Sequence, residues 1–215
     1  MPEVTDICKA LSKKVLLVEG KNDCHVIMAL CASHALPDSF TIYACDNREA
    51  AVRRFNAMIV SPDRPITLGL VIDADDNTAA EKWQTIQTKI AEHGYYPPQI
   101  PTSGGIIIQS IGNLPRLGIW IMPDNSLPGA LEDFLCKMAN QDALKQACAC
   151  VDTALSMGIA SFKQAHHSKA IIHTYLAWQD EPGKPLGSAI TAKLLAHDSE
   201  AGQTFVAWLK DLFCS

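Results

Sequence analysis

The sequence has no hydrophobic run long enough to cross a membrane, since no stretch of about 18 or more apolar residues occurs. Residues 1–12 carry Glu3 and Asp6 and have no apolar centre, so we expect no signal peptide there. Internal repeats and low-complexity segments are also missing. These absences predict a cytoplasmic protein without a membrane partner.

Basic residues are scarce as well. Lys and Arg number 18 against 23 Asp and Glu, which gives a net charge of −5 and a pI of about 5.8. A broad basic surface of the kind that binds DNA or RNA regardless of sequence is therefore not expected. Any contact with nucleic acid must be local, assisted by a metal ion, or provided by a partner protein.

The cysteine pattern excludes the common zinc and redox motifs. None of the eight cysteines forms a CxxC pair, and Cys148 and Cys150 are poorly spaced for a zinc site. In a cytosolic chain, cysteines that lie in apolar or helical stretches usually behave as small buried hydrophobic residues.

What the sequence does contain is enough apolar material for a core, at 48% of 215 residues. Short apolar runs without alternation predict buried strands. A stretch with helical periodicity follows each of the first three runs. The predicted strands span 15–18, 40–44, 67–72, 106–108 and 117–122, and the predicted helices span 22–32, 48–60 and 78–93. This order predicts an α/β fold with a mainly parallel, Rossmann-like sheet flanked by helices. The turn signal Gly112-Asn113 predicts that the last two strands form a hairpin.

The character of the chain changes after Asp124. Helices are predicted over 128–139, 141–156, 162–178 and 201–213, with a loop over 180–187. We therefore expect an α/β core over 1–125 and a helical C-terminal extension over 126–215, packed on the sheet as one compact unit.

Acidic residues follow three of the predicted strands. Glu19 follows the first, Asp73 and Asp75 the third, and Asp124 the last. Ligands of parallel α/β sheets bind at the carboxyl ends of strands. In an extended segment, Asp73 and Asp75 would point to the same side, and Glu19 would face them from a neighbouring strand. Clustered carboxylates repel each other, and Mg²⁺ resolves that conflict.

Each of these acids also has a possible structural role. Asp75 could cap the helix that begins near residue 78, and Glu19 could be a surface residue at a strand end. Each acid alone is more often structural, but acids at three strand ends together favour a site.

The sequence VLLVEGKND at 15–23, followed by VIDAD at 71–75, resembles the Toprim domain. That domain is shared by topoisomerases, bacterial primases, recombination-mediator proteins and OLD-family nucleases. The stretches 118–125, 129–135 and 184–187 extend the resemblance to a stand-alone Toprim-like family of unknown function. The resemblance implies a metal-dependent phosphoryl-transfer fold.

The resemblance also implies residue roles. Glu19, with Gly20 beside it, would act as general acid or base and as a further metal ligand. Asp73 and Asp75 would bind Mg²⁺, with Mn²⁺ as a substitute. Glu132 resembles an acid that binds a second metal in OLD-like nucleases, although its place near a helix start explains it equally well.

Two further acids and four lysines are candidates. Asp23 has a weaker claim, because an acid in the first turn of a helix also complements the helix dipole. Asp124 is a candidate as a strand-end acid. Lys21, Lys163, Lys169 and Lys184 could contact a phosphate, and Lys184, in a Pro/Gly-rich loop, is the first choice.

Two hypotheses of function follow. The first is a Mg²⁺-dependent phosphodiesterase, a nuclease acting on DNA or RNA. The second is a non-catalytic or partner-activated module that binds nucleic acid or a nucleotide, beside an ATPase encoded elsewhere. A topoisomerase is not expected, because none of the four tyrosines lies in a recognisable cleavage domain.

Overall fold

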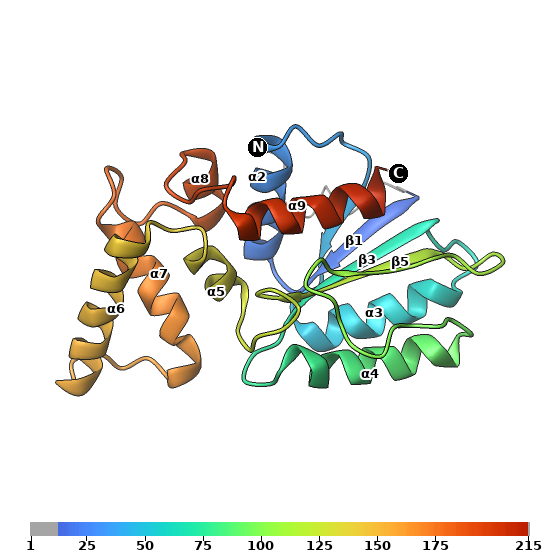
Figure 1. Ribbon diagram of the computed structural model, residues 1–215, viewed down its shortest axis with the longest axis horizontal. Coiled ribbons are helices and arrows are strands. Elements are labelled where there is room, and N and C mark those ends of the chain that lie inside the picture. The colour runs from blue at the N-terminus through green and yellow to red at the C-terminus, as the bar shows by residue number, and fades with distance from the viewer. Residues whose placement is uncertain (1–12, 215) are drawn as a thin grey trace.

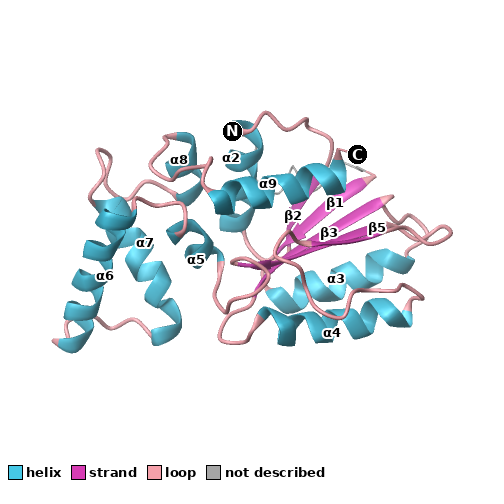
Figure 2. Ribbon diagram, in the orientation of Figure 1, coloured by secondary structure: helices cyan, strands magenta, loops and turns pink. Residues whose placement is uncertain are grey.

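The computed structural model describes residues 13–214. It contains a five-stranded sheet with the strand order β2-β1-β3-β5-β4 (Figures 1 and 2). The strands are β1 (Lys14–Val18), β2 (Thr41–Ala44), β3 (Thr67–Asp73), β4 (Ile106–Ile108) and β5 (Arg116–Met122). Neighbouring strands are parallel except for the antiparallel β4–β5 hairpin. The predicted α/β class and the hairpin are confirmed, whereas the predictions for residues 1–12 lie outside the described residues.

Helices cover both faces of this sheet (Figure 1). One face carries α2 (Lys21–Ser33) and α9 (Glu200–Phe213), and the other carries α3 (Arg48–Val60) and α4 (Ala79–Glu92). Side chains alternate between the two hydrophobic clusters, so that Leu16 packs toward the α2 face and Leu17 toward the α3 face. Burial on both faces explains why the strands are continuous apolar runs in the sequence.

Two glycines allow α9 to approach the sheet closely. Gly69 on β3 and Gly118 on β5 are register partners on neighbouring strands. A Cβ atom at Gly118 would lie 2.2 Å from Cδ2 of Leu212, and one at Gly69 would lie 3.1 Å from Cζ of Phe213. Larger residues here would push α9 off the sheet.

The C-terminal helices have two different arrangements. They are α5 (Leu131–Cys136), α6 (Gln141–Ser156), the 3₁₀ turn η1 (Gln164–His166), α7 (His167–Ala177), α8 (Leu186–Thr191) and α9. As predicted, α9 packs on the sheet, whereas α6 and α7 pack against each other beside it, with α7 also contacting α5 (Figure 1). The expected packing of the whole extension on the sheet therefore describes only part of it.

The predicted loop over 180–187 ends earlier than expected. Residues 186 and 187 form the first turn of α8, which packs on α2 so closely that a Cβ at Gly187 would lie 2.7 Å from the carbonyl oxygen of His25. Gly187 therefore serves helix packing, and Pro185 precedes the helix at its N-cap.

Within residues 13–214, no helix combines the length and the apolar character needed to span a membrane. That range contains seven cysteines. Cys24 and Cys45 are buried, as predicted, but Cys150 and Cys214 are exposed.

Candidate functional site

A cleft of about 520 Å³ opens at the carboxyl ends of β1, β2 and β3. We call it the acidic pocket, because seven acids from separate segments line it. They are Glu19, Asp23, Asp46, Asp73, Asp75, Glu132 and Asp133. The sequence prediction that acids from different strand ends converge at one edge of the sheet is therefore confirmed for β1 and β3.

Glu19 lies directly beside Asp73. The strands β1 and β3 are parallel neighbours with Val18 opposite Val71, so the residues that follow them are adjacent. Oε1 of Glu19 accepts a hydrogen bond from the backbone N–H of Asp73 at 2.8 Å. Burial, opposed by this hydrogen bond and supported by the charges of Asp23 and Asp75, raises the pKa of Glu19 to about 7.

Asp73 is the last residue of β3 and the most strongly perturbed acid of the pocket. Its Oδ1 accepts a hydrogen bond from the backbone N–H of Leu131, the first residue of α5, at 3.1 Å. Burial first, and then the nearby charges of Asp23, Glu19 and other acids, raise the pKa of Asp73 to about 9. The pocket thus concentrates more negative charge than its surroundings stabilise.

Asp23 has the helix-start role considered for it, and it also lines the acidic pocket. In the first turn of α2, its Oδ2 accepts a hydrogen bond from the backbone N–H of Gly20 at 3.1 Å, which is a helix-start contact. Only 7% of the residue is exposed, and its Oδ1 has no hydrogen-bond partner in residues 13–214. Burial raises the pKa of Asp23 to about 6. A buried carboxylate oxygen without a partner is costly unless a ligand satisfies it.

The predicted geometry of Asp75 is wrong, although the residue does line the pocket. The strand ends at Asp73, and Asp75 has a left-handed backbone with φ of 54°, so the alternation of an extended strand does not reach it. Its backbone pairs with Gly129 through two hydrogen bonds of 2.8 Å. Its carboxylate forms ion pairs with Arg48 and with Lys82, the latter at 3.4 Å.

Glu132 and Asp133, at the start of α5, also line the acidic pocket. Oε1 of Glu132 lies 3.5 Å from Nζ of Lys169, which comes from α7 and is another lining residue. Asp133 is held by the backbone N–H of Ala130 at 2.8 Å and by the hydroxyl of Ser168. Asp133 is therefore a helix-start acid, whereas Glu132 faces a single cation.

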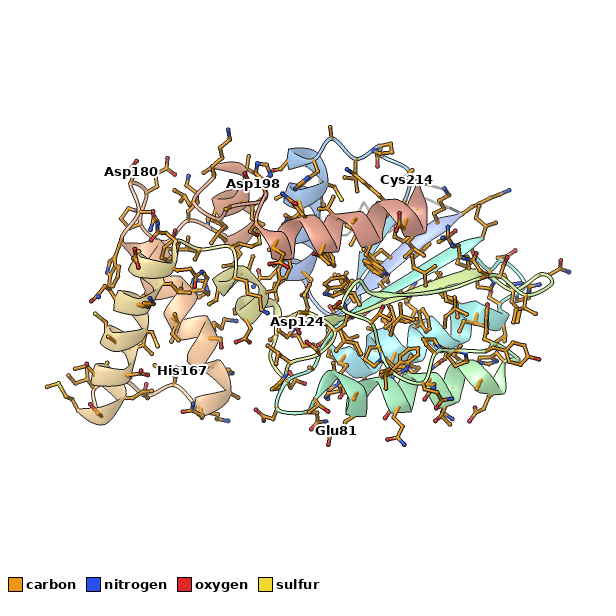
Figure 3. All side chains as sticks on the ribbon, viewed as in Figure 1. Glu81, Asp124, His167, Asp180, Asp198 and Cys214 are labelled. Atoms are coloured by element: carbon orange, nitrogen blue, oxygen red, sulfur yellow. The ribbon has the colours of Figure 1, made fainter. Side chains whose placement is uncertain are left out.

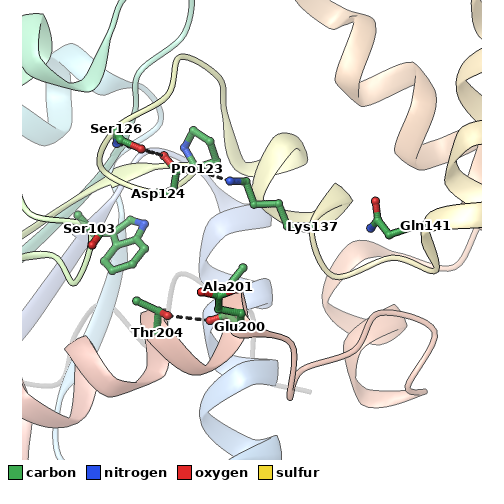
Figure 4. A pocket seen from close by; sticks show the side chains of 10 residues that line it. Ser103, Pro123, Asp124, Ser126, Lys137, Gln141, Glu200, Ala201 and Thr204 are labelled. Atoms are coloured by element: carbon green, nitrogen blue, oxygen red, sulfur yellow. Dashed lines mark hydrogen bonds and ion pairs between the residues drawn. The ribbon is translucent and has the colours of Figure 1, made fainter.

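Asp124, which is labelled in Figures 3 and 4, is not among the residues that line the acidic pocket. It lines a second cleft of about 530 Å³, together with Lys137 and Trp120. Burial raises its pKa, but hydrogen bonds from the backbone of Leu127, from Lys137 and from Ser126 outweigh that effect and lower the pKa to about 2.

Lys184, the lysine first chosen from the sequence, is also not a lining residue of the acidic pocket. It forms an ion pair with Glu181 in the loop after α7. Lys21 and Lys169, two of the other lysines considered, do line the pocket.

Sequence reasoning missed three contributors to this region. Asp46 follows β2 and lines the pocket, so the strand-end rule applied to Glu19 and Asp73 would have found it. Arg48 is the first residue of α3 and Lys82 lies on α4, and no local sequence signal links either of them to Asp75.

The acidic pocket fits a hard divalent cation in its chemistry. Across residues 13–214, no group of three or more His, Cys, Asp or Glu side chains is arranged so that it could hold a metal ion. Mg²⁺, however, is usually held by one or two carboxylates, with waters and substrate phosphate as its other ligands. The unpartnered Oδ1 of Asp23 and the raised pKa values of Glu19 and Asp73 are what an added positive charge would relieve.

Comparison with known proteins yields one match. A family model described as "Protein of unknown function (DUF3226)" matches residues 13–214. No curated protein and no solved structure matches the chain.

Proposed function

Because the chain belongs to the DUF3226 family, whose description names no function, we propose a function from the acidic pocket itself. The protein is a Mg²⁺-dependent phosphodiesterase that hydrolyses DNA or RNA. The resemblance of its strand-end motifs to the Toprim domain and to OLD-family nucleases is part of this proposal. So is a cytoplasmic location, with which the free thiols of Cys136, Cys148 and Cys150 are consistent.

One observation carries the proposal. Glu19, Asp23 and Asp73 come from three segments, lie at the carboxyl edge of a parallel sheet, and all have raised pKa values. Acids that are buried together without enough donors are expected at functional sites rather than at structural ones. A structural acid at the same edge, such as Asp124, has its full set of donors.

The residues of the acidic pocket have separate roles in metal binding and in proton transfer. Asp73 and Asp23 would hold Mg²⁺ or Mn²⁺, which when bound supplies positive charge for the phosphate oxygens. Glu19 has a pKa of about 7, so it exchanges a proton readily near neutral pH and is suited to act as general base or acid. Lys169, which also lines the pocket, supports negative charge that develops on the phosphate.

The second candidate is a binding module without catalysis. The net charge of −5 favours it, because an acidic protein gains little from long-range attraction to a polyanion. In that case a partner protein, such as an ATPase, would present the nucleic acid or nucleotide to the pocket.

A cleavage assay separates the two candidates. Plasmid, single-stranded DNA and RNA are incubated with the protein and Mg²⁺ or Mn²⁺, and then with the variant Asp73→Asn. Cleavage that needs the metal and is lost in the variant supports the enzyme. Absence of cleavage, together with a melting temperature that does not change on adding metal, would instead favour the module.

A further inference from the structure

A third cleft, of about 490 Å³, adjoins the acidic pocket, and Asp46 lines both of them. We call it the arginine cleft. It lies between the end of β2 and the side of α3, and its lining includes Tyr43, Asp46, Ala50, Arg53, Arg54 and Ala57. In the described sheet β2 is an outermost strand, so this cleft lies at the edge of the sheet. A chain molecule bound in the acidic pocket can therefore continue into the arginine cleft without crossing the sheet.

The spacing of residues along α3 explains how the cleft forms. Ala50, Arg53, Arg54 and Ala57 follow the pattern i, i+3, i+4 and i+7, which places them on one face of the helix. The two alanines are small, so they leave space on either side of the arginines. Ala50 and Tyr43 also pack against the hydrophobic cluster on the α3 face of the sheet, whereas both arginines are exposed. The cleft therefore has an apolar base and a cationic rim.

No carboxylate neutralises the arginines of this cleft. Among residues 13–214, no acid forms an ion pair with Arg53 or Arg54. Arg48, at the start of the same helix, differs from them, because it pairs with both Glu49 and Asp75. The lining of the arginine cleft carries two positive charges and a single negative charge, that of Asp46. Its net charge is therefore opposite in sign to that of the acidic pocket beside it, and it favours an anion.

The position of Arg54 indicates what kind of anion fits. Its Cζ lies 3.6 Å from the centre of the Tyr43 ring, a cation–π contact that orients the guanidinium without neutralising its charge. Arg54 is exposed, so the side of the guanidinium that faces away from the ring is available to a ligand. Nucleic-acid bases stack on guanidinium planes as they do on aromatic rings. In a duplex the bases are stacked on each other, so only an unpaired base reaches such a surface.

We propose that the arginine cleft binds a nucleotide of single-stranded DNA or RNA, next to the phosphodiester that lies in the acidic pocket. The base stacks on Arg54, which Tyr43 supports from behind, and Arg53 binds the phosphate of the same nucleotide. The inference rests on the proposed function, because it names single strands as the substrate class of that site. It also explains how a protein with a net charge of −5 holds a polyanion, since the attraction is confined to one cleft.

Binding measured in chelator at low salt tests the cleft separately from catalysis. Fluorescence anisotropy gives the Kd of a labelled thymidine decamer, of an abasic decamer with the same phosphates, and of a duplex of the same length. Wild type should bind the thymidine strand at least about fivefold more tightly than either of the others, because only that strand offers unpaired bases. The same measurement with a uridine decamer of RNA shows whether both kinds of single strand bind.

Four variants separate stacking from charge. Arg54→Met should weaken binding of the thymidine strand about tenfold, and Arg54→Lys, which keeps the charge but not the planar group, should lose the preference for bases. Arg53→Met should weaken the thymidine and abasic strands alike, by about threefold, and lower the salt dependence. Lys145→Met removes the same charge from an exposed residue of α6 that lines neither cleft, and it should change each Kd less than about twofold. Circular dichroism melts show which variants are folded, and Arg54→Lys carries the test if Arg54→Met is not.

The outcomes distinguish this inference from the function on which it rests. A preference for unpaired bases that is lost in the Arg54 variants, with Lys145→Met unchanged, supports the cleft. If wild type cleaves DNA or RNA but binds abasic strand and duplex as tightly as the thymidine strand, or if the Arg54 variants bind like wild type, the inference is overturned while the enzyme stands. If the binding results are as expected but no metal-dependent cleavage occurs, the enzyme fails, and the arginine cleft is the binding site of the non-catalytic module.

Discussion

Asp73 and Asp124 lie at the ends of neighbouring parallel strands, yet their environments shift their pKa values in opposite directions. Asp73 ends β3, where it is opposite Met122 of β5, and Asp124 follows two residues later in the adjacent chain segment. The pKa of Asp73 is raised to about 9, and that of Asp124 is lowered to about 2. A strand-end position therefore does not by itself make a functional acid.

The neighbours of each carboxylate account for the difference. Asp124 accepts hydrogen bonds from Ser126, Leu127 and Lys137, so its charge is stabilised. Asp73 receives a hydrogen bond from Leu131 and is otherwise surrounded by acids. An acid with a full set of donors is part of the framework, whereas an acid short of donors is available to a ligand.

Catalysis should show the largest contrast between the two acids. We expect Asp73→Asn to lower the rate of metal-dependent DNA or RNA cleavage by about 100-fold or more, because it removes a carboxylate that would hold Mg²⁺ beside the reacting phosphate. Asp124→Asn should change the rate by less than about threefold, since Asp124 does not line the acidic pocket and contributes little to its charge. Equal losses in the two variants would break the comparison.

Stability should respond to the two acids with opposite sign. The raised pKa means that folded Asp73 retains its proton from about pH 4 to about pH 9, where the unfolded chain has lost it. Folding stability due to this group therefore falls as pH rises through that window. Without divalent cation, Asp73→Asn should be more stable than wild type at pH 8, by roughly 1–3 kcal/mol.

That gain corresponds to a rise in melting temperature of about 2–4 °C per kcal/mol for a chain of this size. Thermal melts in chelator at about pH 3 and pH 8 test it, because the gain should shrink toward zero near pH 3, below the ordinary pKa of Asp, where the carboxyl group is mostly protonated in both states. A variant that is destabilised at pH 8 would show that Asp73 is adequately solvated in the folded protein.

A smaller contrast is expected between two lysines that each pair with an acid. Lys169 lines the acidic pocket beside Glu132, and Lys137 lines the cleft beside Asp124. Lys169→Met should slow cleavage about tenfold through lost support of phosphate charge. Lys137→Met and Lys184→Met should each leave the rate within about twofold. Rates measured under the same Mg²⁺ concentration decide whether the two clefts differ in function.

The smallest expected effect is the loss of folding stability when the charged hydrogen bonds of Asp124 are removed. The lowered pKa of Asp124 means that its contribution to stability is present above about pH 4 and is lost as pH falls toward about pH 2. Because this group is partly solvated, Asp124→Asn should cost only about 0.5–1 kcal/mol at pH 7. Denaturant titrations at pH 7 and pH 2.5 should show that the cost disappears in acid; a cost that persists would point to packing instead of charge.

Local patterns predicted the sheet and its edge well. The uninterrupted apolar runs of the strands reflect burial on both faces, and the order of elements indicated which strand ends share an edge. Glu19 and Asp73 were found in this way, because their positions depend only on strand ends and parallel pairing.

Tertiary contacts determine the positions of the site residues that sequence patterns do not predict. Asp75 leaves the extended conformation because its backbone pairs with Gly129, which is distant in the sequence. The sequence favours Lys184 because it lies in a Pro/Gly-rich loop, but Lys169 lines the pocket because α7 packs against α5. No spacing rule links Arg48 with Asp75, since their contact depends on where α3 begins relative to β3.

The most direct test of the account is an anomalous difference map from crystals soaked in Mn²⁺. The account predicts a peak in the acidic pocket, within about 2.5 Å of a carboxylate oxygen of Asp73. Well-diffracting, Mn²⁺-soaked crystals with no peak at Asp73, Asp23 or Glu19 would contradict it.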